Sequence, residues 1–391
     1  MARFAIICEY NPLHRGHAYH LQKARELGAD EIVCIMSGNF TQRAEPAMAH
    51  KYTRARAAVL CGADLVVELP FVHAASSAEF FACAGVAAAD ALGADVLFFG
   101  SECNDVNRLT EHAKIANSEK FKQIYQDLIK TNIGTAAAYA RAFEQVSEQP
   151  FSTLSNDLLG LSYCKAILSG GYDITPVCIA REGSAYTQTK LSGTFSSATA
   201  LRALASEKGL QELRFHIPQQ SYDALLSAQQ AGELFGNGSA YSAALLSLLR
   251  ATPTERITSA ALCSGGLGER IASAAQQATN IAQLYELVAH KSLPVSHVRR
   301  AVLYAALGIT EQDLRRTPEY LGVLAANARG RAILSSLRHT CPVPLITKPA
   351  DAPDCAQRAL TDRADALYTL GMQMPQSAAF FKRQSPFMDI K

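Results

Sequence analysis

Three histidines at a spacing of three residues follow an apolar segment near the start of the chain. The apolar segment covers residues 4–8, and residues 11–20 read NPLHRGHAYH, with His14, His17 and His20 around Gly16. Imidazole groups bind metal ions, donate hydrogen bonds to anions, or simply occupy a helix surface. The spacing allows all three roles, so the surrounding residues have to decide between them.

The neighbours of these histidines favour an anion site. Pro12 stiffens the loop, and Gly16 lets the backbone approach a ligand closely. A helix that begins near His17 presents its first amide groups to an anion. His14 and His17 then face phosphate oxygens, where an imidazole stabilises the charge that develops during phosphoryl chemistry.

A metal site is the weaker interpretation of the same residues. It needs three neutral imidazoles that converge on one ion and are held by further hydrogen bonds. His14 precedes the helix, so it does not share a helical face with His17 and His20. We therefore predict no metal-binding residues. A plain surface role stays open, above all for His20.

A second polar segment, SSATALR, stands far along the chain at residues 196–202. Its serines and threonine are typical N-cap residues, and we expect a helix that ends at Gly209. Ser197, Thr199 and Arg202 would face phosphates at the start of that helix. A cap without a ligand and a solvated arginine are the alternatives.

The elements that must position these residues repeat one pattern over the first hundred residues. Apolar strands are expected at 4–8, 31–38, 62–70 and 93–102, and helices near 17–27, 50–61 and 74–92. Three of the strands follow a Gly-Ala-Asp sequence, which is typical of a helix end. Strands that are apolar throughout and alternate with helices predict a parallel sheet covered on both faces.

The fold class that follows is α/β, with a doubly wound, Rossmann-like sheet. Such sheets bind ligands outside the carboxyl ends of their strands, where the first four loops would converge. The second loop, SGNFTQRAEPA, offers Gly38, Asn39, Gln42 and Arg43 to the same rim, with a capping turn as the alternative. A further strand is expected at 172–181.

The chain changes character after about residue 210. Segments such as SAYSAALLSLLRA and PVSHVRRAVLYAALGI have helical periodicity, and residues 319–339 with PLITKP suggest a small mixed α/β element. At 391 residues, two domains are expected. We predict a catalytic domain at 1–208 and a mostly helical domain at 209–391.

Composition narrows the class of protein further. The hydrophobic share is 49%, the charged share 18% and the net charge +2, so no overall charge excess indicates a nucleic-acid partner. The ten cysteines form no C-x-x-C pair, which is typical of reduced thiols in the cytoplasm. No apolar run is long enough to span a membrane. We expect a soluble, cytoplasmic protein.

Family resemblance sharpens the anion site. YNPLHRGH resembles the H-x-G-H motif of the nucleotidyltransferase superfamily, and SSATALR resembles its second, Ser/Thr-rich motif. The sequence K-M-S-K-S of the aminoacyl-tRNA synthetases is absent. In order along the chain, seven segments are similar to the bacterial tRNA(Met) cytidine acetate ligase family: EYNPLHRGHAYHLQKARE, VCIMSGNFTQRAEPA, DLVVELPFVHAASSAEFFA, LFFGSE, SNDLLGLSYCKAI, IAREGSAYTQT and SSATALR.

The resemblance implies an enzyme that activates acetate with ATP and acetylates N4 of the wobble cytidine of elongator tRNA(Met). We expect Mg²⁺ to accompany ATP, because free ATP is scarce in cells. It implies His14 and His17 as catalytic residues. The nucleotide site would comprise Ile7, Cys8, Glu9, Tyr10, Asn11, Pro12, Leu13, His14, Arg15, Gly16, His17, Ala18, Tyr19, His20, Gly100, Asn156, Arg181, Glu182, Ser197, Thr199 and Arg202. RNA binding would fall to local basic segments with Arg299, Arg300 and Arg331, each of which is alternatively a solvated helix charge.

Two other functions share these motifs. A small-molecule adenylyltransferase that makes a dinucleotide cofactor would use the same H-x-G-H chemistry, but the long helical second half argues against it. An RNA-binding factor without activity is the third hypothesis, and the intact His14, Gly16 and His17 weigh against it. The sequence does not determine the oligomeric state.

Overall fold

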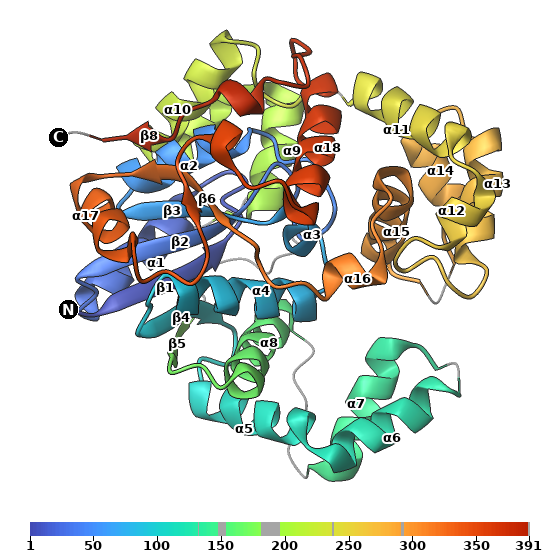
Figure 1. Ribbon diagram of the computed structural model, residues 1–391, viewed down its shortest axis with the longest axis horizontal. Coiled ribbons are helices and arrows are strands. Elements are labelled where there is room, and N and C mark those ends of the chain that lie inside the picture. Colours follow the sequence, from blue (N-terminus) through green and yellow to red (C-terminus); the bar gives the residue numbers. More distant parts are fainter. Residues whose placement is uncertain (132, 148–153, 181–195, 237, 291–292, 390–391) are drawn as a thin grey trace.

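The computed structural model describes residues 1–131, 133–147, 154–180, 196–236, 238–290 and 293–389 (Figure 1). Its strands are β1 (Arg3–Cys8), β2 (Glu31–Ser37), β3 (Leu65–Leu69), β4 (Val96–Ser101), β5 (Thr175–Ala180), β6 (Leu321–Ala326), β7 (Leu345–Ile346) and β8 (Phe387–Met388).

The helices of the first half are α1 (Arg15–Glu26), α2 (Lys51–Leu60), α3 (Phe71–Ala74), α4 (Ala78–Ala91), α5 (Val106–Asn117), α6 (Glu119–Ile129), α7 (Thr135–Val146), α8 (Ser155–Gly170) and α9 (Ala198–Lys208).

The helices of the second half are α10 (Gln219–Gln230), α11 (Ser239–Ala251), α12 (Thr254–Thr258), α13 (Leu267–Gln277), α14 (Ile281–Val288), α15 (Val295–Leu307), α16 (Glu311–Leu314), α17 (Ala328–Leu337) and α18 (Ala356–Leu370). Short 3₁₀ helices lie at Leu210–Phe215, Pro349–Asp351 and Phe381–Arg383.

The central sheet has the strand order β5-β4-β1-β2-β3-β6-β7, with β8 also paired to β6. Strands β1 to β5 are parallel to one another. The four strands predicted in the first hundred residues and the later strand near 175 are all present, so the predicted α/β fold class is confirmed. Because β1 lies between β2 and β4, the order reverses at β1, which is where doubly wound sheets bind ligands.

Two apolar cores cover the two faces of the sheet. On one face, α1 and α2 pack against β1 and β2 through side chains such as Leu21 and Ala55. On the other face, α4, α8 and α17 pack through side chains such as Phe81, Leu161 and Ile333. Alternate residues of each strand enter opposite cores, which explains why the strands are apolar throughout.

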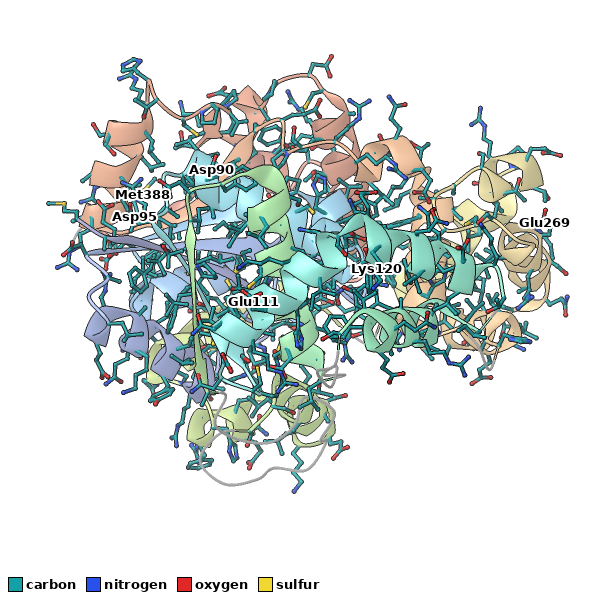
Figure 2. The ribbon with its side chains drawn as sticks, turned by 90° about the horizontal axis from the view of Figure 1, so that it is seen from below. Asp90, Asp95, Glu111, Lys120, Glu269 and Met388 are labelled. Carbon is teal, nitrogen blue, oxygen red and sulfur yellow. The ribbon has the colours of Figure 1, made fainter. Side chains whose placement is uncertain are left out.

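A group of helices, α11 to α15, lies beside the sheet and is well separated from α17 at the other end (Figure 1). Figure 2 shows the same extension, with Glu269 of α13 at the opposite end of the view from Met388 of β8. The predicted helical character of the second half is confirmed by these elements. No helix in the described ranges is long and apolar enough to span a membrane.

The small α/β element expected near 319–348 forms, but it extends the main sheet. Strand β6 pairs antiparallel with β3, and β7 and β8 pair with β6. Periodicity correctly indicates a strand and a helix here, but it carries no information on which sheet edge the strand joins. The second half of the chain thus contributes to the sheet of the first, and the domain boundary at 208 stays a prediction.

Candidate functional site

A cavity of about 650 Å³ lies at the carboxyl ends of β1, β4 and β5. Its wall includes residues from the loops after β1 and β2, from the end of β4, and from the starts of α1, α8 and α15. The predicted site residues that line it are Ile7, Cys8, Glu9, Tyr10, Asn11, His14, Gly16, His17, Tyr19, His20, Gly100, Asn156, Ser197, Arg299 and Arg300.

Other predicted site residues do not line the cavity. Leu13 is buried in the core and Arg15 is exposed at the start of α1. Among the described residues, the predicted ones outside the lining are Pro12, Leu13, Arg15, Ala18, Thr199, Arg202 and Arg331. Arg181 and Glu182 lie outside the residues that the structure describes.

His14 and His17 stack on each other at the start of α1. Their ring centroids are 3.7 Å apart, at an angle of 21°. His14 caps the helix: its Nδ1 accepts the N–H of Gly16 at 3.1 Å, and Nδ1 of His17 accepts the N–H of His14 at 3.4 Å. Because both Nδ1 atoms are acceptors, each neutral ring carries its proton on Nε2. The pair is therefore fixed as two Nε2–H donors at a helix N-terminus, which suits an anion.

His20 lies one turn further along α1 and belongs to the cavity wall. Its ring stacks on Phe98 of β4 with centroids 4.4 Å apart. Its Nε2 is buried without a hydrogen-bond partner in the described structure. Burial lowers the pKa of His20 to about 4, so the ring is neutral near pH 7. The surface role left open for His20 does not fit this placement.

The Ser/Thr-rich segment forms the start of α9. Ser197 is the N-cap and accepts the N–H of Ala200 at 3.1 Å. Arg202 donates to the carbonyl of Asn11 at 2.8 Å and to the hydroxyl of Thr199 at 3.3 Å. Ser197 thus reaches the cavity directly, whereas Thr199 and Arg202 support the loop that carries His14.

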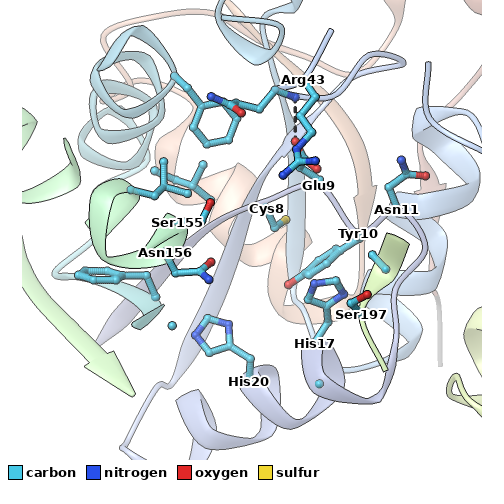
Figure 3. Close-up of a pocket in the computed structure, with 18 of the residues that line it drawn as sticks. Cys8, Glu9, Tyr10, Asn11, His17, His20, Arg43, Ser155, Asn156 and Ser197 are labelled. Carbon is cyan, nitrogen blue, oxygen red and sulfur yellow. Dashed lines mark hydrogen bonds between the residues drawn. The ribbon is translucent and has the colours of Figure 1, made fainter. Parts of the chain in front are cut away.

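The end of β4 and the first turn of α8 form the opposite wall. A side chain added at Gly100 would meet no atom within 4 Å, so a ligand can approach the backbone there. Asn156, at the start of α8, donates to Glu102 at 2.5 Å. Asp157 is 2% exposed and accepts from Ser101 and from the N–H of Cys103, so it holds the loop after β4 in place. Asn156 is thereby fixed on one side of the cavity (Figure 3), and Gly100 lines the same cavity.

The loop after β2 and helix α15 close a further side of the cavity. The loop was expected at this rim, whereas the part that α15 plays was not. Gln42 and Arg43 line the cavity, and Arg300 donates two N–H groups to the carbonyl of Gln42 at 3.1 and 3.0 Å. Arg299 forms an ion pair with Glu45. The basic sequence HVRRAV was the only local signal, and we interpreted it as an RNA-binding surface.

The three arginines predicted to bind RNA do not form one face. Arg299 and Arg300 are in the cavity wall. Arg331 is on α17, which follows the carboxyl end of β6, and it donates to the carbonyl of Asp389 at 2.5 Å. Because β6 runs antiparallel to β3, α17 begins at the sheet edge opposite to the cavity. Arg300 is also only 9% exposed, which leaves it little contact with an RNA outside.

Two further residues of the second loop have structural roles. Asn39 donates to Asp365 at 2.8 Å and accepts the N–H of Lys51 at 2.9 Å, away from the cavity. A side chain at Gly38 would collide with the carboxylate of Glu68. Only Gln42 and Arg43 of this predicted group line the cavity.

The cavity is rich in cationic and hydrogen-bond-donating groups. Arg43, Arg299 and Arg300 line it together with the three histidines, and Glu9 is its one carboxylate among the described residues. No group of three or more metal-ligating side chains gathers anywhere in the described ranges. Such a lining fits an anionic ligand, and a volume near 650 Å³ accommodates a nucleotide.

Comparisons with known proteins agree with this geometry. The family model described as HIGH Nucleotidyl Transferase matches residues 1–383. The tRNA(Met) cytidine acetate ligase of Thermoanaerobacter sp. is 36% identical over 359 residues, 89% of either chain. The enzyme of the same name from Limosilactobacillus reuteri is 36% identical over 381 residues, 95% of this chain and 96% of its own.

Solved structures agree as well. Thermotoga maritima TmcAL without ligand superposes with a TM-score of 0.91 at 29% identity, and both chains are covered completely. The same protein bound with alpha-thio ATP gives a TM-score of 0.87, again with complete coverage. The full-length matches indicate the same family as the fold and the histidine pair at the switch point of the sheet. This chain belongs to the HIGH nucleotidyl transferases and, among them, to the tRNA(Met) cytidine acetate ligase family.

Proposed function

We propose that this protein activates acetate with ATP and acetylates N4 of the wobble cytidine of elongator tRNA(Met). The first step forms acetyl-adenylate and pyrophosphate, and the second forms N4-acetylcytidine and AMP. The observation that carries the proposal is the stacked pair His14–His17, two Nε2–H donors at the N-terminus of α1 inside a nucleotide-sized cavity. The names of the full-length relatives support the choice of acetate and tRNA.

The residues present fit ATP. The first turn of α1 and the rings of His14 and His17 would hold the phosphates, and the open space at Gly100 would admit the ligand close to β4. Arg202 keeps the His14 loop in place through the carbonyl of Asn11. Mg²⁺ would enter with ATP, bound chiefly by phosphate oxygens and water.

The first step needs charge control more than proton transfer. Acetate and ATP repel each other, and attack on the α-phosphorus places further charge on the departing pyrophosphate. Hydrogen bonds from His14 and His17, together with Arg43 in the lining of the same cavity, would stabilise that charge as it grows. This interpretation makes both histidines catalytic residues.

One incubation separates the proposal from its alternatives. The protein is mixed with ATP, labelled acetate and unmodified tRNA, and the RNA is digested to nucleosides. Labelled N4-acetylcytidine supports the proposal. A dinucleotide cofactor formed from an added mononucleotide supports a small-molecule adenylyltransferase, and RNA binding without either product supports a binding factor. The protein would act in the cytoplasm, where it meets ATP and tRNA.

His17→Ala tests the catalytic assignment. Loss of one Nε2–H donor should lower acetate-dependent ATP–pyrophosphate exchange by about a hundredfold or more, the usual effect of losing such a donor. Filter binding of tRNA should stay within about twofold. Full exchange activity in the variant contradicts the assignment.

A further inference from the structure

Glu9 is the one acidic side chain among the described residues that line the cavity. It stands in a wall that also carries Arg43, Arg299 and Arg300. The phosphates of ATP and the carboxylate of acetate gain no binding energy from a carboxylate, because like charges repel. Burying a carboxylate is also costly. A role in the chemistry would explain why an acid stands here.

Among the residues that the structure describes, the protein uses only one oxygen of Glu9. Oε1 accepts the N–H of Gln42 at 2.8 Å, which fixes the carboxylate at the end of β1. Within the described residues, Oε2 accepts no hydrogen bond, and Glu9 takes part in no ion pair. Figure 3 shows Glu9 beside Arg43 on one side of the cavity, with Asn156 and His20 on the other. The second oxygen therefore remains available to a ligand in the cavity.

The charges around Glu9 come from three elements. Arg43 lies in the loop after β2, Arg54 on α2 and Arg202 on α9, and Tyr163 of α8 is the neutral titratable neighbour. The N–H groups of Arg54 go to backbone carbonyls, including that of Glu9 itself, and those of Arg202 go to Asn11 and Thr199. Burial outweighs the three arginines and raises the pKa of Glu9 above its ordinary value of 4.5.

The two proposed steps differ in their need for a base. In the first step, acetate attacks as an anion and pyrophosphate leaves as an anion, so no proton has to move. In the second step, the nucleophile is an aromatic amine, whose lone pair is delocalised into the ring. The amine nitrogen becomes positively charged as it attacks a carbonyl, and it has to lose a proton before the product can form.

We propose that Glu9 is the general base of the acetyl-transfer step, and this inference rests on the proposed function. The N4 lone pair forms a C–N bond to the acetyl carbonyl, and Oε2 takes the proton from N4. The C–O bond between the acetyl group and the adenylate phosphate then breaks, and its electron pair leaves with AMP. The proton on Glu9 is released to water after the products depart.

The test measures the two steps separately. Step one is acetate-dependent ATP–pyrophosphate exchange without RNA. Step two is single-turnover transfer from synthetic acetyl-AMP to an unmodified elongator tRNA(Met) transcript. Glu9→Gln keeps an oxygen for the N–H of Gln42 but accepts no proton. We expect it to slow transfer about a hundredfold, and to slow it at least tenfold more than exchange.

The pH profile and two further variants complete the test. Wild-type transfer should rise with pH through the pKa of Glu9 and then level off, because only the carboxylate accepts the proton. Glu9→Gln should lose this rise, and Glu9→Asp should retain it at a reduced rate. Glu79→Gln is the matched control, because it removes an exposed carboxylate of α4 beside Ala78, outside the cavity lining.

Each outcome bears on one proposal. An equal loss of exchange and transfer in Glu9→Gln would show that Glu9 serves nucleotide binding or loop position, and it overturns the inference. Transfer at the wild-type rate with an unchanged pH profile overturns it too. A wild-type protein that shows neither exchange nor transfer removes the proposed function, and the inference with it.

Discussion

The three histidines after β1 show that the surroundings of a residue determine its chemical role. His14, His17 and His20 have the same side chain, but hydrogen bonds from backbone N–H groups fix the first two as Nε2–H donors. His20 instead stacks on Phe98 with a buried, unpartnered Nε2 in the described structure. Two of the rings therefore suit charge stabilisation, and the third suits recognition of a neutral group.

Because the Nε2 of His20 has no hydrogen-bond partner in the described structure, we predict that it contacts the nucleotide directly. His20→Phe keeps the ring and its stacking but removes the nitrogen. One lost hydrogen bond is worth about 1–1.5 kcal/mol, so the KM for ATP in pyrophosphate exchange should rise about tenfold, with a smaller change in kcat. Because His20 is already neutral, the wild-type KM should not change between pH 6 and 8 through this group. An unaltered KM in the variant would assign His20 to the cavity wall alone.

At the scale of elements, α15 connects the helical half to the cavity. It brings Arg299 and Arg300 against the loop after β2, where one pairs with Glu45 and the other holds the carbonyl of Gln42. Buried Arg300 is thus a fixed part of the wall, whereas Arg299, with a side chain 30% exposed, remains accessible at the rim. Helix α17 carries Arg331 to the opposite edge of the sheet.

Charge reversal on these two helices tests the RNA-binding prediction. Arg299→Glu should weaken tRNA binding and reduce the slope of log affinity against log salt by about one, the effect of one lost phosphate contact. Arg331→Glu is the matched variant, and we expect the wild-type slope. Equal losses in both would mean that the RNA reaches both edges of the sheet. Unchanged binding in both would end the prediction for these arginines.

At the scale of the whole molecule, a buried charge cluster joins the two halves of the chain. Lys51 at the start of α2 donates to both oxygens of Glu68 on β3, at 2.9 and 2.8 Å, and to Asp365 of α18 at 2.8 Å. Asn39 donates to the same aspartate. Asp365, which is 326 positions from Asn39, thus completes the environment of the loop that also carries Gln42.

Lys51→Met should destabilise the protein by about 3–5 kcal/mol, because Glu68 and Asp365 would remain buried without their cation. Chemical denaturation measures this change. Adding Glu68→Gln and Asp365→Asn should recover a large part of the loss, since no unpaired charge then remains buried. A cost below about 1 kcal/mol for Lys51→Met would mean that water or another group neutralises the acids.

The sequence by itself determined the local structure and the kind of ligand. Apolar strands, Gly-Ala-Asp helix ends and the N-caps act over a few residues, so they predicted β1 to β5 and the helices that alternate with β1 to β4. NPLHRGH placed a glycine and two histidines at a helix start, and Ser197 at a second cap, which indicated phosphates. These signals are short-range, and they do not depend on where the rest of the chain goes.

The tertiary structure decided which distant residues complete the site. It placed α15 against the cavity, separated Arg331 from Arg299, and joined β6 to β3. It also left Glu9 as the one carboxylate of the described lining, with burial as the largest influence on its pKa. Burial and contacts across more than 250 residues arise from packing of whole elements, and no local pattern encodes them. The NPLHRGH motif therefore predicted phosphate chemistry. Only the fold showed Glu9 as a carboxylate in the same cavity, where we propose that it acts as a base.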